Sequence, residues 1–312
     1  MIDKEFKART DLAVELEEDI ECESGKVDGI EVVEKWAEKG NIKITKVMVK
    51  NENGRKLIGR DIGNYITLES EELAYPDEGY HREMSLQIAK YVKGLLPKKN
   101  KVKVMITGLG NREATPDSLG PRVVDNIFIT RSITDDGKKY EISAVAPGVM
   151  GQTGMEAAEI IKGIVKEVDT DILIVVDSLA ARNISRLNTT IQISDTGIMP
   201  GSGVGNHRKG ITKETIGVPV IAIGVPTVVD AATIVSDTLE NLLEALQKVK
   251  LLGEIKMMLD EFSSEEKYKL IKEVATPKVS AMYVTPKDVD ATIKYLGYTI
   301  SEGLNIIWGE SI

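Results

Sequence analysis

The stretch "DILIVVDS", residues 171 to 178, decides the fold that we expect for this chain. Its five consecutive apolar residues are typical of a strand that is buried on both faces. Similar runs occur at "KVKVMITG" (101–108), "YEISAVAPG" (140–148) and "VPVIAIGVP" (218–226). Strands of this kind belong to mainly parallel sheets that helices cover on both sides.

Helical patterns alternate with these runs, at "YHREMSLQIAKYVKGLL" (80–96), "GMEAAEIIKGIVKEV" (154–168) and "TVVDAATIVSDTLENLLEALQKV" (227–249). The alternation predicts a three-layer α/β/α sandwich with a mainly parallel sheet. We expect the last helix to begin at Thr227, because Asp230 follows three residues later in a near capping box.

Two regions fall outside this alternation. Residues 27–75 hold shorter strand-like pieces, "KITKVMVK" (43–50) and "NYITLES" (64–70), which predict a small β elaboration beside the main sheet. Residues 249–284 are rich in charge, and we interpret them as a peripheral helical excursion. We expect residues 14–312 to form a single α/β domain.

The composition excludes several classes of function. The chain has 40 basic and 49 acidic residues, a net charge of −9, and its acids cluster in "ELEEDIECE" (15–23), which would repel nucleic acid. One cysteine, Cys22, and two histidines, His81 and His207, cannot build a disulfide or a Cys/His zinc site. No run approaches 18 apolar residues and the start is charged, so we expect a cytoplasmic protein without membrane contact.

Two aspartates follow predicted strands at the edge where open α/β sheets bind ligands. Asp177 ends "LIVVD", and Asp117 lies in the loop after "VMITGLGN". Two carboxylates at the same end of adjacent strands can share a proton and activate a water between them. Taken singly, each aspartate is equally well interpreted as a cap on a helix or turn, so a structural role stays open.

The loop "GLGNREATPDSLGPRVVDN" (108–126) does not have the pattern of a dinucleotide site. The position of the third glycine holds Glu113, and an anion there would oppose a pyrophosphate. We interpret the glycines as allowing a sharp exit from the strand, and Pro116 as constraining the loop that presents Asp117.

Other candidate groups are weaker. Asp195, Thr196 and Gly197 spell the catalytic tripeptide of pepsin-like and retroviral proteases, but those folds are all-β. We interpret Asp195 as a turn residue that can line the cleft, and His207 as an exposed loop histidine. The chain has no Gly-x-Ser-x-Gly elbow, and the acids around Cys22 would make it a poor nucleophile.

Eight motifs together resemble one family, the germination protease of spore-forming bacteria. They are "RTDLAVE" (9–15), "GLGNREATPDSLGPRVVDN" (108–126), "APGVMGQTG" (146–154), "DSLAAR" (177–182), "TIQISDTGI" (190–198), "PGSGVGN" (200–206), "VPTVVDA" (225–231) and "MYVTPKDVD" (282–290). The resemblance implies a homotetrameric endopeptidase that degrades small acid-soluble spore proteins at germination and needs no cofactor. It places the two essential aspartates of an atypical aspartic protease on Asp117 and Asp177. Arg182 is a basic residue that can hold one of these acids ionised.

The fold is also expected to be similar to that of hydrogenase maturation endopeptidases, in which comparable acids bind nickel. A metal-dependent endopeptidase is therefore an alternative, although the histidine expected downstream as a third ligand is lacking. Two carboxylates without histidine or thiolate suit only weakly held hard cations, so we predict no transition metal. A third alternative is a non-catalytic protein that binds a peptide at the same edge of the sheet.

The N-terminal stretch "KARTDLAVELEED" (7–19) resembles the family's substrates, which are cut after an acid, an apolar residue and an alanine. Asp11, Leu12 and Ala13 have this order. We therefore predict a zymogen whose propeptide, residues 1–13, can occupy its own cleft and is removed by self-cleavage close to the Ala13–Val14 bond. The surrounding charges predict an exposed, accessible stretch.

Overall fold

A nine-stranded sheet forms the centre of the computed structural model, which describes residues 10–24, 28–75, 78–131, 139–202, 208–235, 238 and 282–309. The four runs expected to be buried strands are strands, and they lie side by side and parallel in the order β5, β4, β6, β8. Their bounds are Tyr140–Val145 (β5), Val102–Gly108 (β4), Ile172–Ala181 (β6) and Val220–Asp230 (β8). The predicted α/β class and its large central sheet are confirmed.

The sheet continues beyond β8 as an antiparallel extension. Its strands, in spatial order, are β7 (Thr190–Ser194), β3 (Gly63–Glu69), β2 (Lys43–Val49) and β1 (Ile30–Trp36). A short strand, β9 (Tyr283–Val284), pairs with the end of β8. The β elaboration predicted at residues 27–75 is thus an extension of the main sheet, and β7, which the sequence analysis did not identify as a strand, joins the two parts.

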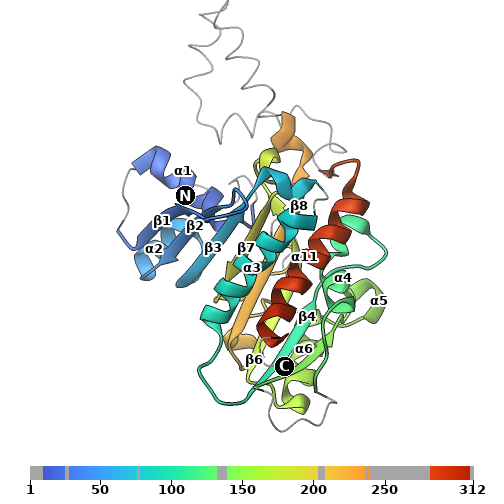
Figure 1. Cartoon of the computed structure of the whole chain (residues 1–312). Coiled ribbons are helices and arrows are strands. Elements are labelled where there is room, and N and C mark those ends of the chain that lie inside the picture. The colour runs from blue at the N-terminus through green and yellow to red at the C-terminus, as the bar shows by residue number, and fades with distance from the viewer. Residues whose placement is uncertain are drawn as a thin grey trace, which may run out of the picture.

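Helices cover both faces of the sheet. On one face, α3 (Glu78–Leu95) and α11 (Val289–Gly309) lie side by side in front of the strands, with α4 (Leu119–Asp125) next to them (Figure 1). On the other face lie α6 (Ala157–Val168) and the short α7 (Lys213–Ile216). Along β6, Ile172, Ile174 and Val176 pack into the first layer and Leu173 and Val175 into the second. Because alternate residues of β6 pack into the two layers and both layers are apolar, the sequence of the strand is a continuous apolar run.

The remaining elements are shorter. The helices α1 (Ala13–Ser24) and α2 (Glu52–Ile58) pack against β2 and β3, where Ala13 and Ile58 join Val47 and Tyr65 in a small cluster. Single helical turns are found at Glu71–Ala74 (η1), Thr115–Asp117 (η2), Met150–Thr153 (α5) and Ile184–Arg186 (η3). No helix in the described ranges is long and apolar enough to span a membrane.

The helix start predicted at Thr227 is wrong. Strand β8 continues to Asp230, because its last residues pair with β6 on one side and β9 on the other. Helical turns begin at Ala231, and the Asp230 carboxylate accepts a hydrogen bond from the Ala232 N–H at 2.8 Å. Most of the helical excursion predicted at residues 249–284 lies outside the described residues.

Candidate active site

Asp177 lies inside β6, one residue beyond the point where β4 stops pairing with that strand. Only 6% of the residue is exposed, and its Oδ1 accepts a hydrogen bond from the Ser178 N–H at 2.9 Å. Burial raises the pKa of the Asp177 carboxyl well above its usual range, and the negative charges of Asp117 and Asp11 raise it further. Asp177 therefore keeps its proton at a pH where an ordinary aspartate is ionised.

Asp117 ends the helical turn η2, in the loop that follows β4. Its Oδ2 accepts a hydrogen bond from the Asn111 N–H at 2.8 Å. Burial raises the pKa of the Asp117 carboxyl, while this hydrogen bond and the positive charge of Arg208 lower it. Because the shift is smaller than that of Asp177, Asp117 is the acid of the two that ionises more readily.

Both carboxyl residues line one cavity, of about 380 Å³, at the carboxyl edge of the parallel strands. Leu109 after β4, Leu179 of β6 and Val228 of β8 contribute to its wall. The sequence-based prediction that Asp117 and Asp177 lie at the same place is consistent with this geometry. Neither acid caps a helix through the hydrogen bonds found: Asp177 is inside a strand, and Asp117 binds an amide upstream of itself.

Two close approaches of the main chain position the Asp117 loop. Gly110 has φ +107°, and a Cβ there would lie 1.9 Å from the Asp117 carbonyl oxygen. A Cβ on Gly108 would lie 2.0 Å from the Gly120 carbonyl oxygen, where α4 begins. These glycines therefore serve the tight turn, as interpreted from the sequence. A side chain of β8 also contacts the loop: the Thr227 hydroxyl donates a hydrogen bond to the Pro116 carbonyl at 2.7 Å.

The N-terminal segment forms part of the same site. The Asp11 N–H donates to the Ala180 carbonyl at 2.9 Å, and the Ala180 N–H donates to the Asp11 carboxylate at 3.0 Å. The prediction of an exposed stretch is wrong here, because Leu12 and Ala13 are fully buried and Val14 is 2% exposed. Leu12 and Val14 bury their apolar side chains against β6. Helix α1 begins at Ala13, so the Ala13–Val14 bond is the first peptide bond of this helix.

The charge in this segment is accommodated by specific partners. Glu15 is fully buried, and its carboxylate accepts the N–H groups of Arg182 and Asn183 at 2.8 Å each. The Arg186 guanidinium lies 3.5 Å from the same carboxylate, and the Thr10 hydroxyl also donates to it. A buried carboxylate with this number of donors is stable in a packed site.

The remaining candidate residues of the sequence analysis either do not lie beside the two acids or fall outside the described residues. Arg182 does not line the cavity of the two acids; the basic charge that acts on both is that of Arg208, which does line it. Asp195 is exposed, and its two oxygens bind the Asn64 N–H at 2.7 Å and the Asn64 amide at 2.6 Å, which joins β7 to β3 outside this cavity. The side chain of Cys22, and the whole of His207, lie outside the described residues.

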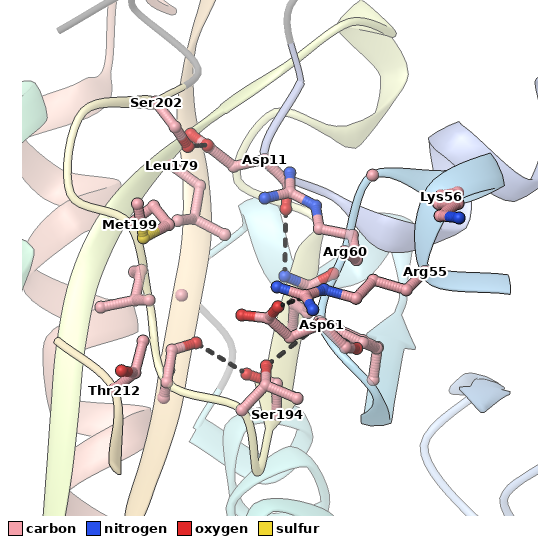
Figure 2. A pocket seen from close by; sticks show the side chains of 18 of the residues that line it. Asp11, Arg55, Lys56, Arg60, Asp61, Leu179, Ser194, Met199, Ser202 and Thr212 are labelled. Atoms are coloured by element: carbon pink, nitrogen blue, oxygen red, sulfur yellow. Dashed lines mark hydrogen bonds and ion pairs between the residues drawn. The ribbon is translucent and has the colours of Figure 1, made fainter. Parts of the chain in front are cut away.

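A second cavity, of about 620 Å³, is also lined by Asp11 of the N-terminal segment (Figure 2). Asp11 and Leu179 line both cavities. Arg55, Lys56 and Arg60 come from α2 and the loop after it, so this end is richer in basic groups. Across the described ranges, no cluster of three or more His, Cys, Asp or Glu side chains is arranged to hold a metal ion.

A carboxyl pair in a cavity at the edge of an α/β sheet is suited to hydrolysis by an activated water, and a family model of peptidases matches residues 7–253. The protein is a protease. The matching model is that of the germination protease, and the chain belongs to this family.

Curated relatives support the assignment over nearly the whole chain. The germination protease of Caldanaerobacter subterraneus subsp. tengcongensis is 44% identical over 305 residues, which cover 96% of this chain and 93% of the relative. That of Clostridium tetani is 44% identical over 310 residues, covering 96% and 95%. Among solved structures, a [NiFe] hydrogenase maturation protease, HycI, from Thermococcus kodakarensis is similar with a TM-score of 0.29 and 16% identity, covering 44% of this chain and 80% of that one.

Proposed function

We propose that this protein is an endopeptidase that degrades small acid-soluble spore proteins during spore germination, by a mechanism that uses Asp117 and Asp177. The observation that carries the mechanism is that half-buried Asp117 and buried Asp177 line one cavity. The pKa of each carboxyl is raised, and that of Asp177 is raised further. Such a difference gives one ionised and one protonated carboxyl at the same pH. Membership of the germination protease family supports the substrate.

In the proposed reaction, ionised Asp117 takes a proton from a water whose oxygen attacks the scissile carbonyl carbon. Protonated Asp177 donates a hydrogen bond to the carbonyl oxygen and stabilises the charge that develops there. When the C–N bond breaks, the proton held by Asp117 passes to the leaving amine. The positive charge of Arg208 acts on both acids and favours the ionised form of Asp117.

We also propose that the protein is made as a zymogen in the spore core, that it forms a homotetramer, and that residues 1–13 are its propeptide. The docked segment supports this idea, because Asp11 lines the cavity of the two acids. The Ala13–Val14 bond is buried at the start of α1, so self-cleavage there requires the segment to leave its docked position first.

The test is cleavage of a purified small acid-soluble spore protein, followed by mass spectrometry of the fragments, with and without a chelator. We expect Asp117→Asn and Asp177→Asn each to lower turnover by roughly three orders of magnitude or more, while the chelator changes nothing. Asp195→Asn is the matched control, because it neutralises an acid outside the cavity. Full turnover by Asp117→Asn or Asp177→Asn would exclude the two-aspartate mechanism, and loss of activity on chelation would favour the metal-dependent alternative.

A further inference from the structure

The contacts of the docked N-terminal segment, taken together with the proposed function, identify where a substrate peptide binds. We infer that the groups holding residues 10–13 are the substrate-binding groups of the active protease, and that Ser202 is the side chain that selects an acidic residue of the substrate. The docked segment and the substrate would then compete for one site.

The main chain of the segment is bound as a peptide ligand would be. Strand β4 pairs with β6 only as far as Val176, and further along β6 both the N–H and the carbonyl of Ala180 are taken by Asp11. The Gln192 amide binds twice, accepting the Ala13 N–H at 2.7 Å and donating to the Asp11 carbonyl at 3.2 Å. One main-chain hydrogen bond to β6, one from the Ala180 N–H to the Asp11 carboxylate and two to the Gln192 side chain thus hold the segment.

The guanidinium of Arg60 holds the segment from the side of the second cavity. It donates a hydrogen bond to the Thr10 carbonyl at 2.8 Å, and Figure 2 shows Arg60 beside Asp11. Leu12 is fully buried against Leu179 and Ala181 of β6. The site therefore offers main-chain partners, an apolar contact and a position for an acid, which are three elements of sequence-selective binding.

The acid position is defined by two donors. One oxygen of the Asp11 carboxylate accepts from the Ser202 hydroxyl and the other from the Ala180 N–H. Hydrogen bonds to an ionised acceptor are stronger than those between neutral groups. An asparagine placed there can keep its oxygen on the Ala180 N–H and donate its NH₂ to the Ser202 oxygen, but it lacks the negative charge that strengthens both hydrogen bonds. Ser202 is the side-chain component of this site, whereas the Ala180 amide is present whatever the sequence.

Removal of the segment would change the shape of the site. Asp11 of the segment and Leu179 of β6 line both the cavity of the two acids and the larger cavity, so the two cavities adjoin at these residues. Without the segment, Ser202, Gln192, Arg60 and Ala180 would lose these hydrogen-bond partners. A peptide that offers the same donors and acceptors restores these hydrogen bonds, which favours its binding at this place.

The first experiment uses the active enzyme and two synthetic peptides, one copying residues 7–19 and one with asparagine at the Asp11 position. We expect the wild-type enzyme to cleave the aspartate peptide with a kcat/KM about tenfold higher or more, mainly through KM. Ser202→Ala should reduce this preference to threefold or less, whereas Ser185→Ala, which removes an exposed hydroxyl on η3, should keep it. An equal loss on both peptides, or an unchanged preference, would overturn the assignment of Ser202.

The second experiment needs no catalysis. In full-length Asp117→Asn protein, hydrogen exchange of the Asp11 and Ala13 amides should be at least several-fold faster after Ser202→Ala or Gln192→Ala, and unchanged after Ser185→Ala. Unchanged exchange in both variants would show that these side chains do not hold the segment. The binding site and the proposed function fail separately, because full turnover by the Asp117→Asn enzyme would disprove the latter and leave the exchange result standing.

Discussion

The protonation of Asp177 gives a prediction at the scale of a single residue. A carboxyl whose pKa is raised by folding contributes stability below its ordinary pKa and loses that contribution as the pH rises through its folded pKa. Asp177→Asn removes the titrating group. We therefore expect the variant to gain in Tm over the wild type as the pH rises from about 4 towards 8, measured by thermal unfolding.

Asp171 provides a control of opposite sign. The Lys103 N–H, with the Lys99 ammonium, lowers the pKa of this partly exposed carboxyl. Its contribution is present above the ordinary pKa and is lost as the pH falls through the folded value. Asp171→Asn should thus lose Tm at neutral pH and approach the wild type in acid. A constant difference for Asp177→Asn at every pH would show that the Asp177 carboxyl does not titrate as proposed.

At the scale of elements, the end of β8 positions the loop that carries Asp117. The Thr227 hydroxyl binds the Pro116 carbonyl, and the Thr227 carbonyl in turn accepts the Thr285 hydroxyl at 2.9 Å. Thr227→Val keeps the shape and removes the hydroxyl. We expect a loss of about 1 kcal/mol in the free energy of unfolding and a fall of roughly tenfold in kcat, because the loop is less well held.

Thr189→Val tests whether that fall is specific. The Thr189 hydroxyl also donates to a carbonyl, that of Ser185, at 2.7 Å, but it lies next to the start of β7 and outside the cavity. This variant should lose a similar or smaller amount of stability and keep its kcat. An equal fall in kcat for both variants, measured with the same peptide, would contradict a role of Thr227 in positioning the loop.

At the scale of the whole molecule, one core joins the antiparallel extension to the parallel strands. Ile66 of β3 and Ile106 of β4 are 4% and 0% exposed and belong to the same cluster of buried residues. We expect one cooperative unfolding transition. Ile66→Ala and Ile106→Ala should each lower the free energy of unfolding of the whole protein by about 2 to 5 kcal/mol. Calorimetry that resolves two transitions, with each variant shifting only one, would show that the extension folds as a separate unit.

Part of this arrangement is encoded locally and was predictable. A strand buried on both faces must be apolar throughout, so β4, β6 and β8 can be recognised in the sequence, whereas β5, at the edge of the sheet, is only partly buried. The acids that follow two such apolar runs, Asp177 and, after a loop, Asp117, and the glycines needed for the turn before Asp117 follow from the same local rules. The sequence by itself thus determined the parallel core and the positions of Asp117 and Asp177 along it.

Only the tertiary structure decided the rest, because it depends on groups far apart in the chain. Thr227 reads as a helix cap, yet pairing with β6 and β9 keeps that segment in the strand. The charges around Asp11 predict exposure, but its partners Ala180 and Ser202 lie 169 and 191 residues away. The pattern of apolar and charged residues in a segment indicates how far that segment can be buried. Which distant donors and acceptors satisfy its charges is settled only when the strands assemble, and that places the N-terminal segment in the site.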